Sequence, residues 1–450
     1  MKRLLTTLFI LSISAAGMRT AAQDTENPMD TLTRSVAAIR SELDVLKRIK
    51  FSGYIQAQYQ VADSSGIGSF AGGTFSPGVD KRFMLRRARL KAQYDSPLND
   101  KGIQTSQYMF QFDVTEKGLT IKDVYAKFTD PCIGWFSVTA GMQNRPFGYE
   151  IGYSSGLRES PERGRMSQTI FPNERDLGGM LTIQGPKTSN WNWLKLEGGF
   201  FNGTGGPSAG ANTSDFDKFK DFIGHLTINR YSKNEKIKWA IGASIYDGGY
   251  RVDTFNVYKF ATDTAGIKGF TIDEKKAEVG KDISTRKEAK REYIGFDGQV
   301  SVDWMAGITT LRAEYFEGKQ PGTSSTTASA AAAVTADTYK RNFNGAYFYF
   351  LQNIAQTPFQ AIVKYDWYDP NTDIKGDEIG KAVKQSGFKT TNSTDIKFTT
   401  LGLGLAYRWD ANLKITAYWD KVTNETSANL SSAIKDIPDN VFTLRVQVKF

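Results

Sequence analysis

The last ten residues of the chain, 441–450, alternate strictly between apolar and polar side chains. The apolar positions are Phe442, Leu444, Val446, Val448 and Phe450. Period-two alternation is typical of a β-strand with one apolar face. At the end of a soluble chain such a strand would expose both an edge and an apolar face, which invites aggregation. In a membrane β-barrel the neighbouring strands cover the edge and lipid covers the face. The terminal strand therefore predicts a barrel that this strand closes.

The chain from Phe51 onward repeats this alternation sixteen times. In the first segment Ile55 and Ala57 occupy one face, while Gln56 and Gln58 occupy the other. Boundaries read in this way are good to a few residues. The predicted strands are 51–61, 83–94, 104–114, 119–129, 133–143, 177–184, 191–202, 219–231, 237–247, 292–303, 307–317, 341–352, 359–368, 398–409, 413–421 and 441–450.

The connections between these segments alternate between short turns and, mostly, long loops. Short turns lie at 130–132, 232–235 and 410–411. Long loops lie at 62–81, 144–176, 248–290, 318–340 and 370–396. Up-and-down barrels place short turns in the periplasm and long loops outside the cell. The chain is therefore predicted to be an all-β membrane protein, a sixteen-stranded antiparallel transmembrane β-barrel over residues 51–450. A barrel of this size encloses a water-filled bore.

The N-terminus carries the only continuous apolar run. Lys2 and Arg3 precede the apolar residues 4–13, and small residues follow up to Ala22. This is the pattern of a secretory signal peptide, here residues 1–22. The mean hydropathy of −0.41 agrees with export to a barrel, because half of every barrel strand faces water. The predicted location is the outer membrane of a Gram-negative cell.

A short periplasmic helix is predicted within residues 23–50. Its apolar residues recur at alternating spacings of four and three, at Leu32, Val36, Ile39, Leu43 and Leu46. That spacing is a heptad seam. The seam is too short to form a stable coiled coil alone, so two arrangements remain open. The helix either joins neighbouring barrels or packs under its own barrel.

Several classes of function are excluded by composition. The chain has one cysteine, Cys132, and one histidine, His225, so neither an internal disulfide nor a zinc site is expected. Outer-membrane hydrolases use histidine as a base, and no serine or aspartate partner for His225 can be identified. Glycine-rich segments 203–210 and 401–405 lack the lysine of a nucleotide-binding loop. We therefore expect no enzyme activity, no cofactor, no metal and no nucleic-acid partner.

Three sequence motifs resemble a known family. They are Phe-Met-Leu-Arg-Arg-Ala-Arg-Leu at 83–90, Asp-Val-Tyr at 123–125, and Gly-Met-Gln-Asn-Arg-Pro-Phe-Gly at 141–148. This pattern resembles the phosphate-selective porin O/P family of Bacteroidetes-type outer-membrane porins. The resemblance implies a sixteen-stranded porin, usually a homotrimer, whose third loop folds into the bore. The terminal Phe450 resembles the signal read by the outer-membrane assembly machinery.

The third loop, 144–176, is the predicted constriction. Its basic residues are Arg145, Arg158, Arg163, Arg165 and Arg175, and its acidic residues are Glu150, Glu159, Glu162, Glu174 and Asp176. Because the two sets are equal in number, we expect most of them to pair within the loop. An arginine left unpaired would serve passing anions.

Alternation also assigns charges to the wall of the bore. The predicted pore-lining basic residues are Arg87, Arg89, Lys91, Arg408, Lys414, Arg445 and Lys449. The opposing acidic wall is predicted at Asp221, Asp247, Asp297 and Asp303. Opposite walls of opposite charge would set up a field across the bore that leads anions along the basic side. In the alternative interpretation, the basic residues only hold the third loop in place.

These features predict a porin for passive diffusion of small hydrophilic solutes, with a mild preference for anions and phosphate as one candidate. Selection would come from bore width and wall charge alone. The partners expected are membrane lipid, small anions and two further copies of the chain. The alternative is a structural or adhesive surface barrel whose extracellular loops bind partners.

Overall fold

The computed structural model describes residues 28–116, 118–205, 215–252, 256–275 and 288–450. The chain divides into two units, Met1–Ile49 and Lys50–Phe450. The predicted signal peptide, 1–22, lies outside the described residues. None of the helices in the described ranges is both long enough and apolar enough to cross a membrane.

The described part of the first unit, residues 28–49, contains one helix, α1 (Pro28–Lys47). Leu32, Val36, Ile39 and Leu43 are all exposed on it, although they share one face by their spacing. The apolar seam is thus a feature of the folded helix as well as of the sequence.

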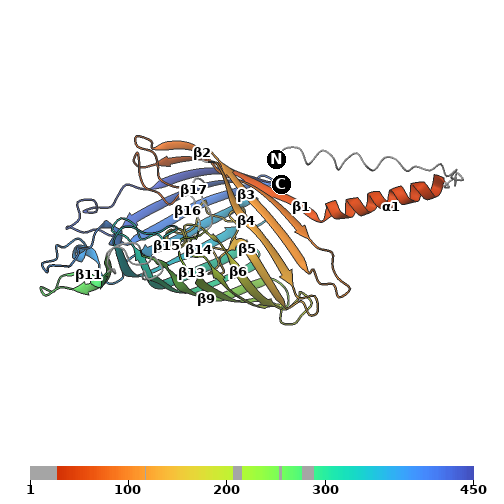
Figure 1. Ribbon diagram of the computed structural model, residues 1–450. Helices are drawn as coiled ribbons and strands as arrows, with labels where there is room; N and C mark the ends of the chain where they lie inside the picture. Colours follow the sequence, from red (N-terminus) through yellow and green to blue (C-terminus); the bar gives the residue numbers. More distant parts are fainter. Residues whose placement is uncertain (1–27, 117, 206–214, 253–255, 276–287) are drawn as a thin grey trace, which may run out of the picture. The chain divides into compact units, whose positions relative to one another are not determined.

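The second unit is built around a barrel of antiparallel strands (Figure 1). The strands that form the barrel are β1 (Ile49–Ala62), β2 (Lys81–Asp95), β3 (Ser106–Thr115), β4 (Gly118–Thr129), β5 (Phe136–Asn144), β6 (Arg175–Gln184), β7 (Leu194–Phe201), β8 (Asp221–Tyr231), β9 (Ile237–Arg251), β12 (Glu288–Trp304), β13 (Gly307–Gly322), β14 (Thr338–Asn353), β15 (Phe359–Asp369), β16 (Phe398–Arg408), β17 (Leu413–Asn424) and β18 (Val441–Lys449). Each pairs with the next, β9 pairs with β12, and β18 pairs with β1. The predicted sixteen-stranded closed barrel is therefore confirmed.

The barrel closes where its first and last strands meet. β1 and β18 pair antiparallel from Tyr54 opposite Lys449 to Ala62 opposite Val441. Beyond this ladder, the N–H of Gly53 donates to the carbonyl of Phe450 at 2.9 Å, and the N–H of Phe450 donates to the carbonyl of Gly53 at 3.1 Å. The terminal residue thus completes the last hydrogen-bonded step of the closure.

The barrel is polar inside and apolar outside. In β18 the side chains of Arg445 and Gln447 are buried, with 4% and 1% exposed, whereas Leu444 and Val446 are 40% and 39% exposed. A soluble protein distributes these residue types the opposite way. The pattern is that of a barrel whose outer surface contacts lipid.

In the described portions of the predicted long loop 248–290, two strands lie outside the barrel. They are β10 (Asn256–Thr262) and β11 (Lys268–Lys275), which form a hairpin. β10 pairs in parallel with β14 at Thr338–Lys340. The sequence interpretation of this region as loop was wrong for these strands. β11 pairs only with β10 among the named strands, and the β14 partner of β10 lies far along the chain.

A β-bulge and a change of face each add a charge to the bore. In β4 the register against β3 shifts between Phe110 and Phe112, so both Lys122 and Asp123 lie opposite Gln111, which faces inward. In β2 the consecutive residues Arg86 and Arg87 both bind the same inward carboxylate. A bulge leaves one extra residue on a strand. Strict alternation placed Arg87 and Asp123 inward but could not place their neighbours Arg86 and Lys122.

Candidate functional site

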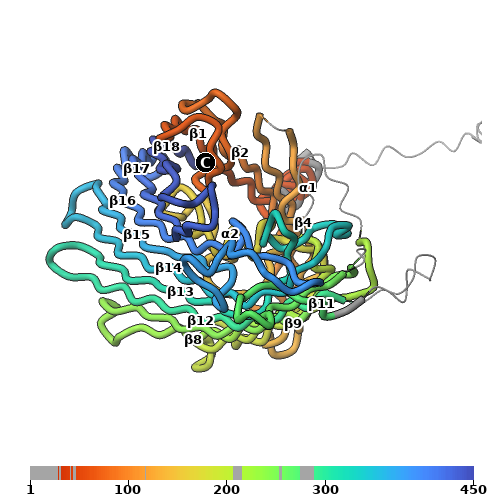
Figure 2. The backbone as a smooth tube through the Cα atoms, turned by 90° about the vertical axis from the view of Figure 1, so that its left-hand side faces the viewer, coloured from red at the N-terminus to blue at the C-terminus, as the bar shows by residue number. Residues whose placement is uncertain are grey.

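The site is the bore of the barrel, which the connection between β5 and β6 enters. Residues 145–174 lead from one strand to the next, and they include the short helix α2 (Arg165–Ile170). Figure 2 shows α2 inside the ring of strands. Long-range hydrogen bonds agree, since the hydroxyl groups of Ser155 and Ser160 bond those of Tyr54 in β1 and Tyr349 in β14, at 2.6 Å in both cases.

An aromatic cluster fastens this loop to one side of the wall. Loop residues Phe147 and Phe171 lie with ring centroids 5.1 Å apart, and Phe147 meets Phe316 of β13 edge to face at 4.8 Å. The remaining members of the cluster are Ile151, Met166, Ile170, Phe201, Ile223, Tyr246, Tyr293, Phe343 and Tyr368. The wall residues come from β7, β8, β9 and β12 to β15, so this part of the bore is packed rather than open.

The backbone of the loop approaches the same wall at Gly148. The carboxylate of Glu314 in β13 accepts the N–H groups of Tyr149 and Glu150 at 2.9 and 3.1 Å. Gly148 has φ of +61°, and a Cβ on it would lie 1.6 Å from Oε1 of Glu314. Only glycine fits this position without a shift of the loop.

Charged contacts hold the loop to the opposite side of the wall. The carboxylate of Glu162 binds the guanidinium groups of Arg86 at 2.8 Å, Arg87 at 2.7 Å and Arg445 at 2.8 Å. Burial alone would raise the pKa of Glu162. The three guanidinium groups outweigh burial and hold this pKa well below its usual range. Three cations meet one anion here, so the cluster carries an excess of positive charge.

The remaining loop charges pair partly with each other and partly with the wall. Within the loop, Glu174 lies 3.1 Å from Arg163 and 3.7 Å from Arg158. Glu159 pairs instead with Arg312 of β13 at 3.1 Å. Arg165 lies 3.8 Å from Asp439, which belongs to a neighbouring loop. Arg175 forms ion pairs with both Asp123 and Glu174. The guanidinium group of Arg145 lies over the ring of Phe171. The expectation that the loop pairs mostly within itself is therefore wrong for Glu159, Glu162 and Arg165, because wall and neighbouring-loop charges lie closer.

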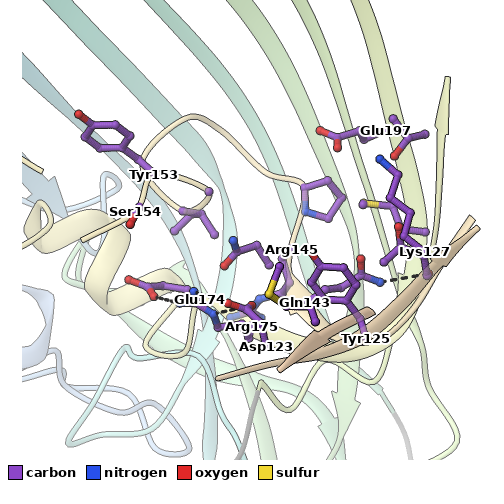
Figure 3. A pocket seen from close by; sticks show the side chains of 18 of the residues that line it. Asp123, Tyr125, Lys127, Gln143, Arg145, Tyr153, Ser154, Glu174, Arg175 and Glu197 are labelled. Atoms are coloured by element: carbon purple, nitrogen blue, oxygen red, sulfur yellow. Dashed lines mark hydrogen bonds and ion pairs between the residues drawn. The ribbon is translucent and has the colours of Figure 1, made fainter. Parts of the chain in front are cut away.

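Two cavities line the side of the bore near β2 to β8. The larger, of about 530 Å³, is lined by Lys91, Lys127, Lys195, Glu197 and His225. Lys127 and Glu197 are labelled in Figure 3. The smaller, of about 130 Å³, contains Arg86, Arg87, Lys122, Glu162 and Arg163. The larger lies toward the end of the barrel with short turns, and the smaller toward the end with long loops.

The two cavities meet at a set of ion pairs. Arg89, Glu174 and Arg175 line both of them. Figure 3 shows Arg175 between Asp123 and Glu174, and Arg175 lies 3.0 Å from Asp123. Arg89 is held by Asp113 at 3.0 Å. The lining that the two cavities share is therefore built from paired charges.

The predicted pore-lining basic residues occupy different environments. Arg87, Arg89 and Arg445 are buried in ion pairs, and Lys414 donates to the carbonyl of Arg158 in the loop at 2.9 Å. Lys91 lines the larger cavity. Arg408 is exposed and Lys449 is half-buried, and both lie near the short-turn end of the barrel.

The predicted acidic wall is not a continuous surface. Asp221 is buried against Arg291 at 2.8 Å. Asp297 lies 2.9 Å from the ring of His225, so the structure supplies the aspartate partner that the sequence did not identify. Asp303 is exposed near the end of β12. Asp247 lies on the outer face of β9, with its side chain 68% exposed and 3.6 Å from Lys290. Its assignment to the bore was wrong, because Ser244 and Tyr246 are the inward-facing residues and Asp247 has the opposite parity.

Several residues that shape the bore were not singled out from the sequence. They are Arg86 and Lys122, together with the aromatic cluster. Aromatic side chains at inward positions, such as Tyr246, Tyr293 and Phe343, were the available signal, since a water-filled bore does not favour them. Among the described residues, no group of three or more histidine, cysteine or acidic side chains could hold a metal ion.

No protein-family model matches the chain, and no curated protein matches its sequence. Its fold is similar to that of solved outer-membrane proteins. The outer membrane channel DcaP of Acinetobacter baumannii has a TM-score of 0.50 and 10% identity, covering 89% of this chain and 97% of that one. Salmonella typhi OmpF in complex with daunomycin has a TM-score of 0.49 and 10% identity, covering 89% of this chain and 97% of that one. The trimer form of Vibrio cholerae OmpT has a TM-score of 0.48 and 9% identity, covering 89% of this chain and 99% of that one.

At these identities the likeness concerns the fold. The sixteen-stranded barrel with a loop folded into its bore defines a porin-type β-barrel. The resemblance to the phosphate-selective porin O/P family stays a prediction.

Proposed function

We propose that this protein is an outer-membrane porin through which small hydrophilic solutes diffuse passively, with a preference for anions. The observation that carries the proposal is the charge of the smaller cavity beside the third loop. This cavity is lined by Arg86, Arg87, Arg89, Lys122, Arg163 and Arg175 against Asp113, Glu162 and Glu174. Six cations facing three anions leave a positive potential in the cavity, which raises the local concentration of anions.

Solutes need no chemistry to pass such a cavity. Guanidinium and ammonium groups replace part of the hydration of an anion, and the paired carboxylates keep that binding weak enough for release. Because the ion pairs are held by the loop and the wall together, the shape of this lining depends on the loop staying in place. The proposed activity is therefore transport, and no enzyme reaction is proposed.

The family resemblance extends this proposal in three respects. It favours phosphate among the anions, a homotrimer as the assembly, and Phe450 as the residue that the assembly machinery reads. The location proposed is the outer membrane, reached through the signal peptide 1–22. The long loops would then face the outside of the cell and the short turns the periplasm.

A planar bilayer measurement tests the proposal. Single channels of the purified protein in a salt gradient should give a reversal potential of the sign expected for anion preference. Lys122→Gln combined with Lys91→Gln should lower the anion-to-cation permeability ratio, because each removes a cavity-lining charge. Lys233→Gln, on an exposed turn between β8 and β9, is the matched control and should leave the ratio unchanged.

The outcomes separate the alternatives. Normal conductance with an unchanged ratio in the double variant would show that the anion preference is wrong while the channel is right. Absence of conductance would favour the alternative, a structural or adhesive barrel. The observation that favours this second candidate is the aromatic cluster, which fills the bore beside β7 to β15.

A further inference from the structure

The chain contains a single histidine, His225, and the structure places it on the wall of the larger cavity. In β8 its neighbour Leu226 is 38% exposed on the outer face, whereas the imidazole side chain faces inward and is only 9% exposed. Histidine is the side chain whose ordinary change of charge falls between about pH 5 and pH 8. The other titratable side chains of this lining are lysine, arginine, tyrosine and carboxylate groups, which ordinarily keep their charge in that range.

His225 meets a carboxylate from a strand that is not its neighbour. Its Nε2 lies 2.9 Å from Oδ2 of Asp297 in β12, although β9 lies between β8 and β12. The contact crosses β9 at Gly242, which is directly opposite Asp297. A Cβ on Gly242 would overlap both Oδ2 of Asp297 and Nε2 of His225. The pair therefore depends on a bare backbone at this position, and residues 240–244 of β9 bring no charge to it.

The charged groups on the β7 and β8 side of the pair are engaged with each other or with another strand. Glu197 of β7, the cross-strand partner of His225, lies 2.7 Å from Lys195. Asp221, four residues away in β8, lies 2.8 Å from Arg291 of β12. None of these ion pairs includes His225, so its charge is balanced by Asp297 rather than by β7 or β8.

The titratable groups on the other side of the pair come from β13 and the third loop. They are Arg312, Glu314, Tyr149, Tyr153 and Glu159. The guanidinium group of Arg312 lies 3.1 Å from Glu159 and 4.7 Å from the centre of each tyrosine ring. Glu314, opposite Asp297, accepts N–H groups of the third loop. Among the described residues, His225 is therefore the only side chain that hydrogen-bonds Asp297.

We propose that His225 makes the anion preference of the larger cavity depend on pH. The inference rests on the proposed function, since it needs ions to pass through this cavity. With a neutral imidazole the pair with Asp297 carries one negative charge, and with an imidazolium it carries none. Elsewhere the same lining carries Lys91 and Lys127. Acidification thus removes a negative charge from a wall that already holds cations, which favours anions.

Reversal potentials in a salt gradient, measured at about pH 8 and about pH 5.5, test the proposal. At about 0.1 M salt, one unit charge roughly 6 Å from a passing anion changes its local concentration roughly twofold. The anion-to-cation permeability ratio of the wild type should rise by about this factor on acidification. His225→Gln should keep the ratio at its alkaline value at both pH values. His225→Lys should keep it at the higher value at both, because its charge is permanent in this range.

A transferred histidine is the matched control. Lys233→His, made in the His225→Gln background, restores one histidine on the exposed turn between β8 and β9, outside the cavity. This double variant should show no change of the ratio with pH. A pH step that persists in His225→Gln, or that the histidine at position 233 restores, would overturn the role of His225.

The outcomes also separate this inference from the proposed function. An anion-preferring wild type whose permeability ratio is the same at both pH values would overturn the inference and keep the function. A cation-preferring wild type whose pH step disappears in His225→Gln would keep the role of His225 and overturn the anion preference. Absence of conductance would overturn both.

Discussion

At the residue scale, the bore depends on the carboxylate of Glu162, which joins the third loop to β2 and β18. Two of its three arginine partners, Arg87 and Arg445, are buried and Arg86 is half-buried, so removal of the carboxylate would take the closest counter-charge from all three. Breaking a buried pair by removing one partner costs about 3–5 kcal/mol in other proteins. A comparable loss is expected here, either as lower stability or as displacement of the loop.

Replacing Glu162 with glutamine tests this role. Glu162→Gln should lower the unfolding temperature, increase channel noise, and shift the permeability ratio further toward anions, because one negative charge is lost. Glu317→Gln, on the outward face of β13, is the control and should behave as the wild type. Wild-type stability and selectivity in Glu162→Gln would show that the arginines are held by other groups.

The pH dependence of this contact has a definite sign. The guanidinium groups hold the pKa of Glu162 below its usual range despite burial. Its contribution to stability is therefore complete above the unfolded pKa of about 4.3 and is lost as the pH falls through the folded value. Between pH 7 and about pH 5 the wild type should keep its conductance. Under more acidic conditions the stability difference between wild type and Glu162→Gln should shrink; a difference that grows on acidification would contradict the assignment.

Gly148 allows a second test with a matched partner in the same loop. Gly148→Ala should destabilise the inserted loop by at least about 1–3 kcal/mol, since the residue has positive φ and its Cβ would overlap Glu314. Gly152→Ala is the control, because its Cβ would lie 4.0 Å from the nearest atom. Thermal unfolding followed on gels compares the two. If both variants lose the same stability, the close approach of Gly148 to Glu314 is not the cause of the loss.

At the element scale, α1 presents an apolar seam that nothing in its own unit covers among the described residues. We expect this seam to join the helices of neighbouring copies. Leu32→Ser combined with Ile39→Ser should loosen the oligomer on gels that resolve trimers, while the barrel remains folded. Ala37→Ser with Ala38→Ser, on the opposite face of the same helix, should have no effect. A monomeric wild type would refute the role of the seam.

At the scale of the whole molecule, closure of the barrel ends at Phe450. Deleting this residue removes both hydrogen bonds to Gly53 and the ring that lies against it. The yield of folded barrel, measured by heat-modifiable migration, should fall. Trp409→Ala removes an exposed aromatic residue at a strand end away from this closure, and should fold normally. Unchanged yield without Phe450 would show that the ladder from Tyr54 to Ala62 suffices to close the barrel.

The sequence by itself determined the barrel. Sixteen alternating segments, such as 441–450, specify which face of each strand is apolar, because side chains in a strand alternate by local geometry alone. The same rule correctly placed Arg87, Arg89 and Arg445 on the inner face. It also predicted that loop 144–176 carries the charges of the constriction.

Only the tertiary structure decided how those inward charges are used. The bulge in β4 places Lys122 beside Asp123, and Glu162 meets three arginines from strands that are distant in sequence. Tyr246, Tyr293 and Phe343 pack against Phe147 and Phe171 instead of facing water. Alternation is a local property of the backbone, whereas partners across the bore depend on where the loop folds, and that is settled by contacts between residues more than a hundred positions apart.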